Sequence, residues 1–215
     1  FGSITKSFNV LERSNANDTL RDAIALATDG RNGPVVLDFP SNFDDGDCGE
    51  LPVESPRYVE GSPNSDSLER AQALIDKSNR PLVVVGADVA TTGATEELMT
   101  FVEAIGATVI SNMDARGIFP ESHPRCAGVM VGNYIPNTLE GELDDLCDLV
   151  VLVGADSLMT HVPWGFNMPA IELVSRPEYR TTVLEPEVRV DGSLSESLKA
   201  LDGSECKGVS IEEID

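Results

Sequence analysis

Glycines at the ends of apolar segments are the residues of this chain whose type and spacing best suit ligand chemistry. In "VVVGADVATTGA", Gly86 ends an apolar run and Gly93 opens a helix-forming segment. Glycine lets a backbone approach a ligand closely, and free amides at a helix start favour a phosphate. The seven-residue spacing does not fit G-x-G-x-x-G, so this turn alone is weak support for a phosphate site.

Two further stretches place glycine in a similar setting. "AGVMVGNY" carries Gly128 and Gly132 in a predicted loop before the next helix, and "VLVGADS" carries Gly154 after another apolar run. A glycine that merely ends a strand is common in α/β domains, and for any single turn this interpretation is favoured. Three such turns on one sheet edge shift the balance towards a cleft of nucleotide size.

The elements that would position these turns alternate along residues 67–202. Continuous apolar, β-branched runs separated by amphipathic helices predict an α/β fold, with a Rossmann-like parallel sheet and helices on both faces. In such sheets, ligands bind at the carboxyl ends of the strands. The predicted helices are 66–78, 93–106, 137–148 and 193–201, and the predicted strands are 81–86, 107–111, 149–154, 170–174 and 181–186.

Residues 1–40 predict less structure than a domain needs. Apolar residues from Leu20 to Ala27 recur at helical spacing, with Asp18 or Thr19 as the cap, and "VVLDF" predicts a short strand. One helix and one strand cannot bury their apolar faces alone. We therefore expect this region to be the end of a domain, or an arm packed on a partner.

Residues 41–66 are acidic and rich in Gly, Pro and Ser, which predicts a linker, and residues 203–215 form an acidic tail. The linker carboxylates lack the spacing of a calcium loop, so a solvated linker is favoured over a metal site. They are Asp44, Asp45, Asp47 and Glu50.

Composition narrows the function classes. The 215 residues carry 37 acidic and 15 basic side chains, for a net charge of −22, which disfavours contact with nucleic acid or anionic membranes. An apolar content of 41% opposes disorder, and a folded, very acidic chain is typical of salt-loving archaea. Four dispersed cysteines and the lack of a long apolar run predict a cytoplasmic protein with reduced thiols. A start at Phe1 suggests processing, or a piece of a longer chain.

Other reactive residues have structural alternatives. His123 and Cys126 lack a second ligand pair, so we expect His123 to brace a turn rather than bind zinc. His161 and Trp164 suit contact with a substrate or a second subunit, but loop packing is favoured. "GADSLM" lacks the second glycine of a nucleophile elbow.

Several segments, taken in order, resemble the thiamine diphosphate-dependent enzymes related to acetolactate synthase, benzoylformate decarboxylase and oxalyl-CoA decarboxylase. The most specific is "ARGIFPESHP" at 115–124, which is similar to the family turn G-K-G-x-x-P-x-x-H-P. The others are "GPVVLDFP", the run from "ALIDKSNRPLVVVGADVATTGATEELMTFVEAIGATVISNMD" into that turn, "AGVMVGN" and "DLCDLVVLVGAD".

The resemblance implies a central domain preceded by the end of a pyrimidine-binding domain, with 1–40 as that end and 67–202 as the centre. In the family, the activating Glu lies in the first domain and the G-D-G…N motif for Mg2+ and diphosphate lies in the third. Gly46-Asp47 lacks the following strand, helix and spaced Asn, so no catalytic residue is assigned. The implied parent is a homo-oligomeric lyase or transferase that binds thiamine diphosphate and Mg2+ only at full length. Its missing domains are the expected partners of this chain, which alone would be a monomer or weak dimer.

The resemblance also implies a site on the central domain. This edge holds FAD in acetolactate synthases, ADP in oxalyl-CoA decarboxylase and no nucleotide in several decarboxylases. The family's R-F-D-D-R and G-M-H-G stretches are absent here, and Asp88 and Asp156 would repel a diphosphate unless Arg116 compensates. An empty site is therefore favoured, then an adenine nucleotide, then FAD. The matching positions are Gly86, Ala87, Asp88, Ser111, Asn112, Met113, Gly128, Met130, Gly132, Asn133, Gly154, Ala155 and Asp156.

The alternative from another functional class is a stand-alone regulatory module that binds ADP, NAD or FAD. A chain that is complete within these residues and binds one of those nucleotides tightly would distinguish it from an enzyme domain.

Overall fold

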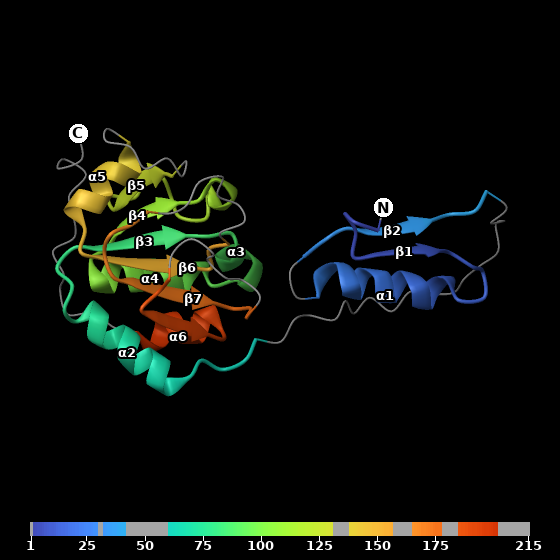
Figure 1. The fold of residues 1–215 in the computed structure, drawn as a ribbon, viewed down its shortest axis with the longest axis horizontal. Coiled ribbons are helices and arrows are strands. Elements are labelled where there is room, and N and C mark those ends of the chain that lie inside the picture. The colour runs from blue at the N-terminus through green and yellow to red at the C-terminus, as the bar shows by residue number, and fades with distance from the viewer. Residues whose placement is uncertain are drawn as a thin grey trace. The chain divides into compact units, whose positions relative to one another are not determined.

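The computed structural model describes residues 2–29, 32–41, 60–130, 138–156, 165–177 and 185–201. The chain divides into two compact units, residues 1–59 and 60–215, which are described separately (Figure 1). In the described parts of the chain, no helix is both long and apolar enough to cross a membrane.

The first unit is a pair of parallel strands joined by a helix. Strand β1 (Ser7–Val10) pairs with β2 (Val35–Asp38), and α1 (Ala16–Thr28) connects them. The helix begins earlier than predicted, after Asn15, and neither Asp18 nor Thr19 caps it. Asp18 instead lies in the first helical turn, where its negative charge interacts favourably with the helix dipole. Its Oδ1 lies 2.9 Å from Nη2 of Arg21. Strand β1 was not predicted because "SFNV" contains no continuous apolar run.

The second unit contains a six-stranded, all-parallel sheet in the order β5-β4-β3-β6-β7-β8. Because β4 and β5 lie on one side of β3 and β6 to β8 on the other, the winding reverses between β3 and β6. The strands are β3 (Pro81–Val85), β4 (Thr108–Ser111), β5 (Cys126–Val129), β6 (Leu149–Val153), β7 (Ala170–Val174) and β8 (Val188–Asp191). The α-helices are α2 (Ser65–Ile75), α3 (Asp88–Thr92), α4 (Thr95–Ile105), α5 (Leu139–Leu146) and α6 (Leu194–Ala200).

Helices cover both faces of this sheet, which confirms the predicted fold class (Figure 1). Ala71 of α2, Phe101 of α4 and Leu198 of α6 share one apolar core with the strand residues that face them. Leu143 of α5 packs in the other core with residues such as Val84. Strands β3, β4, β6 and β7 are buried at every position, as expected for strands covered on both sides.

Three segments of the second unit differ from the sequence prediction. Residues 126–129 form β5 rather than a loop, so Gly128 is a strand residue with a φ of +135°. The last strand is 188–191, whereas it was predicted at 181–186; of that range, residues 181–184 lie outside the described structure and 185–186 are not in a strand. The short helix α3 was not foreseen because its five residues "DVATT" carry no helical periodicity.

The predicted linker is also shorter than expected at its carboxyl end. Residues 60–64 belong to the second unit, and Asn64 caps α2 by accepting a hydrogen bond from the Ser67 amide at 3.2 Å. The side-chain oxygen thus satisfies one amide that has no partner within the helix.

Candidate ligand site at the carboxyl edge of the sheet

The parallel order brings the predicted site residues of four strands to one edge. Gly86, Ala87 and Asp88 follow β3; Ser111 ends β4, and Asn112 and Met113 follow it; Gly128 and Met130 lie in and after β5; Gly154, Ala155 and Asp156 follow β6. Gly132, Asn133, His161 and Trp164 lie outside the described residues. The predicted grouping is therefore present for the described positions, although shared placement at an edge does not make each residue a ligand contact.

The neighbouring backbone explains the glycine at position 86. A Cβ there would lie 2.1 Å from the Gly154 carbonyl oxygen and 2.3 Å from the Ala155 Cα. The Gly86 amide donates to the Val153 carbonyl at 2.9 Å, and the Asp88 amide donates to the Gly154 carbonyl at 3.2 Å. The turn after β3 thus holds the turn after β6, at the point where the winding of the sheet reverses.

Gly93 also has a conformational explanation. It ends α3 in the left-handed region, with a φ of +76°, and a Cβ at this position would meet no atom within 4 Å. The next helix, α4, has Glu96 and Glu97 in its first turn, where their carboxylates already complement the helix dipole. Neither side of the connection between α3 and α4 offers the free amides and the positive charge that favour phosphate binding.

A buried carboxyl group, that of Asp88, lies beside this turn. Asp88 is only 5% exposed, and one of its carboxylate oxygens accepts a hydrogen bond from the Ser175 hydroxyl. Burial raises the pKa of Asp88 and the Glu60 carboxylate adds to this, whereas the Ser175 hydrogen bond and the charge of Arg176 oppose the rise. The other oxygen, Oδ1, has no hydrogen-bond partner among the described residues.

Ser175 and Arg176 were not among the predicted site residues. Arg116, the nearest candidate in sequence for offsetting the acidic edge, is exposed, and its guanidinium lies 3.9 Å from Glu121. Arg176 is buried at the end of β7 and acts on Asp88 through its charge. The signal was available in the sequence, since Ser175-Arg176 directly follows the apolar run "AIELV" and must end at the same edge.

The remainder of the edge is acidic or apolar. Burial raises the pKa of Asp114, and the nearby charge of Asp156 raises it further. Asn112 is buried, and within the described part of the chain neither its Nδ2 nor its Oδ1 has a hydrogen-bond partner. Met130 is buried, whereas Met113 is 58% exposed. A diphosphate placed here would lie among the carboxyl groups of Asp88, Asp114 and Asp156, and the described residues include no group of three or more His, Cys, Asp or Glu that could hold its metal ion.

His123 makes contacts that brace a turn, as expected. Its Nδ1 accepts from the Arg125 amide at 3.2 Å, and its ring meets Phe119 edge to face, with 4.9 Å between ring centroids. Its Nε2 lies 3.5 Å from Oε1 of Glu103. Cys126 is buried, and burial raises the pKa of its thiol. Across the described ranges, no group of three or more His, Cys, Asp or Glu residues is arranged to hold a metal ion.

Comparison with models of known protein families gives a match to one domain. The model described as "Thiamine pyrophosphate enzyme, central domain" matches residues 68–201. The chain belongs to the thiamine pyrophosphate enzyme family. Its matched residues span the unit that contains the six-stranded sheet, from α2 to the end of α6.

Individual relatives agree with this assignment. The chain is 32% identical over 165 residues to a probable acetolactate synthase large subunit of Methanocaldococcus jannaschii, covering 72% of this chain and 27% of that protein. It is 32% identical over 157 residues to the acetolactate synthase large subunit of Corynebacterium glutamicum, covering 71% of this chain and 25% of that protein. The chain therefore spans about a quarter of the length of these relatives.

Solved structures show the same fold. Benzoylformate decarboxylase from Polynucleobacter necessarius aligns with a TM-score of 0.71 and 23% identity, covering 95% of this chain and 40% of that one. A "putative thiamin diphosphate-dependent enzyme" from Mycobacterium smegmatis aligns with a TM-score of 0.69 and 23% identity, covering 92% of this chain and 40% of that one.

These findings confirm the central-domain assignment and lend no support to a stand-alone nucleotide-binding module. Membership of this family implies thiamine diphosphate as the coenzyme. The salt-loving source stays a prediction.

Proposed function

We propose that this chain is the structural centre of a thiamine diphosphate-dependent 2-oxoacid decarboxylase or carboligase of the acetolactate synthase type, and that it is inactive without its companion domains. The central-domain match over 68–201 carries this proposal. The coenzyme and Mg2+ would be held by the pyrimidine- and diphosphate-binding domains, with residues 1–40 as the end of the former. The complete enzyme would be a cytoplasmic homo-oligomer.

The sequence supports the assignment of coenzyme binding to the other domains. The sequence after Gly46-Asp47, "CGELPVESPR", does not carry the pattern of a strand and helix, or the spaced Asn, of a diphosphate-binding motif. At the carboxyl edge of the sheet, the carboxyl group of Asp88 is buried, and burial raises its pKa. Asp114 is an exposed residue, and partial desolvation together with the nearby charge of Asp156 raises the pKa of its carboxyl group. Such groups oppose a second anion, so the role we assign to this unit is to connect and space the catalytic domains.

We further propose that the carboxyl edge carries no FAD, and that an adenine nucleotide is a second choice after an empty edge. The close approach of Gly86 to Gly154 accounts for the glycine without a ligand. Arg116, the candidate cation nearest in sequence, lies 3.9 Å from Glu121.

Extending the chain tests the proposed activity. The coding sequence that flanks both ends would be expressed together with these 215 residues, and CO2 release from pyruvate and from benzoylformate would be measured with thiamine diphosphate and Mg2+. We expect the extended protein to release CO2 from at least one of these 2-oxoacids and to form a product that contains a new C–C bond. An extended protein that binds the coenzyme yet decarboxylates neither would refute the proposed reaction class.

A further inference from the structure

The residues that lead into α2 are docked on the turn between β8 and α6. The Ser193 amide donates a hydrogen bond to the Gly61 carbonyl at 2.7 Å, and the Gly192 amide donates to the Val174 carbonyl at 2.9 Å. The turn is therefore bonded to β7 on one side and to the incoming chain on the other. Figure 1 shows this incoming chain running into the start of α2.

Gly192 makes the close approach of these two segments possible. A Cβ at this position would lie 2.7 Å from the Pro63 nitrogen and 2.8 Å from the Gly61 carbonyl oxygen, distances that side chains essentially never adopt. Its φ of +138° also suits glycine. By contrast, a Cβ at Gly93 or Gly117, both of which have positive φ, would meet no atom within 4 Å. Position 192 thus needs glycine for its backbone angle and for the chain that lies against it.

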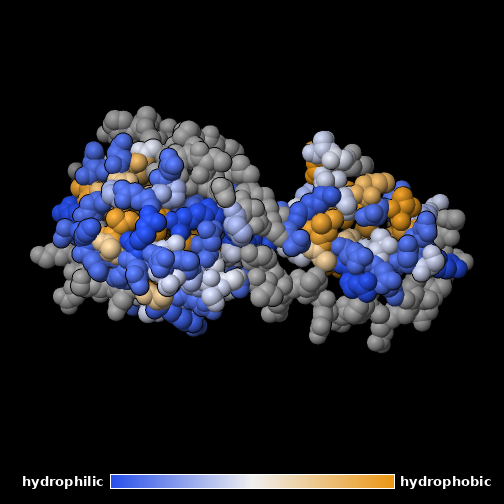
Figure 2. All heavy atoms as spheres, turned by 60° about the horizontal axis from the view of Figure 1, so that its bottom comes forward, coloured by the Kyte–Doolittle hydropathy of each residue, from blue (hydrophilic) through white to orange (hydrophobic). Residues whose placement is uncertain are grey.

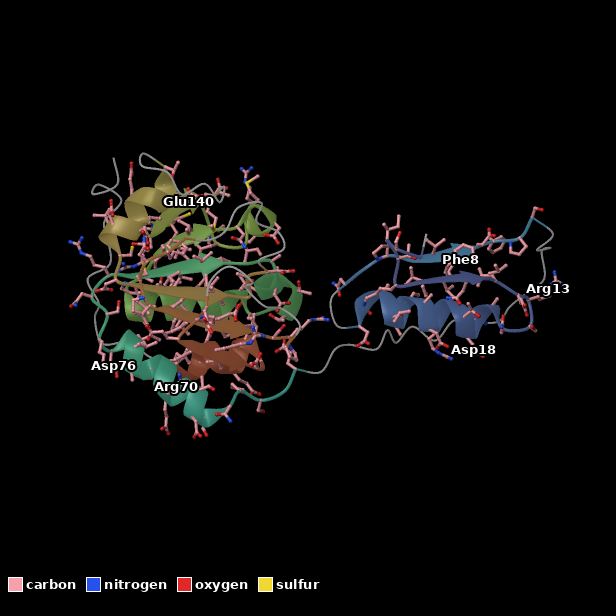
Figure 3. All side chains as sticks on the ribbon, in the orientation of Figure 1. Phe8, Arg13, Asp18, Arg70, Asp76 and Glu140 are labelled. Carbon is pink, nitrogen blue, oxygen red and sulfur yellow. The ribbon has the colours of Figure 1, made fainter. Side chains whose placement is uncertain are left out.

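The docked segment is also held by the helix that follows it. Asn64 caps α2, and the Arg70 guanidinium of α2 donates to the Glu187 carbonyl at 2.8 Å, just before β8 (Figure 3 shows Arg70 on α2). Ala71 and Ile75 of α2 are buried in the core of the sheet. The chain is therefore fixed to the β8 side of the sheet at two places, one at the carboxyl edge and one along α2.

The docked segment reaches the candidate site. The Glu60 carboxylate lies close enough to Asp88 to raise its pKa through charge repulsion, in addition to the larger effect of burial. Asp88 in turn accepts from Ser175, the residue that follows β7. The end of the connecting segment is thus part of the rim around the buried carboxylate.

We propose that the β8–α6 turn, Gly192-Ser193, is a clamp that fixes residues 60–63 to the carboxyl edge of the sheet and so sets the point where the connecting segment leaves the second unit. The clamp works through one backbone hydrogen bond and one steric fit. It does not depend on the reaction of the complete enzyme.

A matched pair of variants at Ser193 tests the hydrogen bond. Ser193 has a φ of −55°, which proline can adopt, and Ser193→Pro removes the amide donor and places the proline Cδ against the Gly61 carbonyl oxygen. Ser193→Ala keeps the amide and removes only the hydroxyl that caps α6, so it controls for loss of the cap. The 215-residue chain would be digested briefly with a Glu-specific protease, and mass spectrometry would give the ratio of cleavage after Glu60 to cleavage after Glu54.

We expect this ratio to rise by about fivefold in Ser193→Pro, since cleavage follows the population of the opened segment and one hydrogen bond is lost. The ratio in Ser193→Ala should match that of the wild type. Equal ratios in Ser193→Pro and Ser193→Ala would overturn the clamp.

A second pair tests the steric fit, and it decides the matter if Ser193→Pro fails to fold. Gly192→Ala places a methyl group against Pro63, whereas Gly93→Ala carries a positive φ in open space. We expect the cleavage ratio to rise in Gly192→Ala and to stay at the wild-type value in Gly93→Ala. A rise of the same size in both variants would show general strain rather than a clamp.

Discussion

The two units differ most in how completely their apolar side chains are buried. Four strands of the second unit are buried along their whole length, whereas three of the four β1 residues are exposed and β2 is only half-buried. Figure 2 shows apolar patches on the surface of the first unit. Among the described residues of the first unit, the exposed large apolar side chains are those of Ile4, Phe8, Val10, Ile24, Leu26 and Phe39.

This difference shows which unit has a core of its own. Two strands and one helix cannot cover each other's apolar faces, whereas six strands with helices on both faces can. Exposed apolar patches of this kind mark surfaces that contact another part of a protein or a partner. The second unit therefore supplies the stability of the chain, and the first unit carries the surface for which we propose the rest of a pyrimidine-binding domain.

A pair of phenylalanine truncations tests this contrast and should give the largest effect. Phe101 of α4 is 1% exposed and Phe8 of β1 is 48% exposed. We expect Phe101→Ala to lower the free energy of unfolding of the second unit by about 3–5 kcal/mol, because it leaves a cavity. Phe8→Ala should leave that free energy unchanged. Urea unfolding would measure both, and equal losses would contradict the division into an intact and an incomplete core.

Alanine at Gly86 should have the next largest effect. Its Cβ would overlap the Gly154 carbonyl oxygen, so we expect a loss of about 3 kcal/mol from overpacking in the folded state. Gly93→Ala, which meets only the cost of a left-handed backbone, should lose about 1–2 kcal/mol. Thermal unfolding of both variants gives the comparison. A well-tolerated Gly86→Ala would show that this glycine serves something other than the turn after β6.

The opposite edge of the sheet carries a carboxylate with the reverse behaviour. Asp148 accepts hydrogen bonds from the Ser78 hydroxyl at 2.5 Å, the Asn79 amide at 2.9 Å and the Arg80 amide at 3.0 Å. Although burial opposes it, these donors hold the pKa of Asp148 below its usual value. We expect Asp148→Asn to lower the free energy of unfolding at pH 7 by about 1–2 kcal/mol, a modest loss because the group is partly exposed.

The sign of the pH dependence follows from the lowered pKa of Asp148. The stabilisation is complete above the unfolded-state pKa of about 3.9, and it is lost as the pH falls through the lower folded-state pKa. Urea midpoints measured from pH 7 down to pH 3 should therefore fall less in Asp148→Asn than in the wild type. Parallel curves would contradict the assignment.

Asp88 should show the smallest effect, with the opposite sign. Because burial raises its folded-state pKa, the folded state holds this proton to a higher pH than the unfolded state does. The contribution of the protonated Asp88 carboxyl group to folding stability is complete below about pH 3.9, the pKa of the unfolded state. It is lost as the pH rises through the raised folded-state pKa. Asp88→Asn should therefore remove a decline in stability above that pH, and its amide oxygen can still accept from Ser175. A steeper decline in the variant would show that the ionised carboxylate stabilises the fold.

The sequence was informative wherever one element buried a long, uniform face. The apolar runs at 81–85, 149–153 and 170–174 predicted their strands closely, because strands covered on both faces require such runs. Strands β1 and β8 were missed or misplaced because they lie at sheet edges, where "SFNV" and "VRVD" mix polar and apolar residues. Edge strands carry a weaker pattern than central ones.

The candidate site was predictable as a place but not as a set of contacts. The ends of parallel strands must share an edge, which located Gly86, Asn112 and Gly154. The partner of Asp88 could not be read from spacing, because Ser175 is brought to it by the strand order of the folded sheet. The contact between Gly86 and Gly154 depends on the same order.

Calorimetric titration of this 215-residue chain with thiamine diphosphate and Mg2+, at low and at molar salt, tests the central claim most directly. That claim is that the chain supplies framework without the groups that hold and activate the coenzyme. We predict no saturable heat, and no CO2 release when pyruvate is added. Stoichiometric binding of the coenzyme, or turnover by this chain alone, would contradict it.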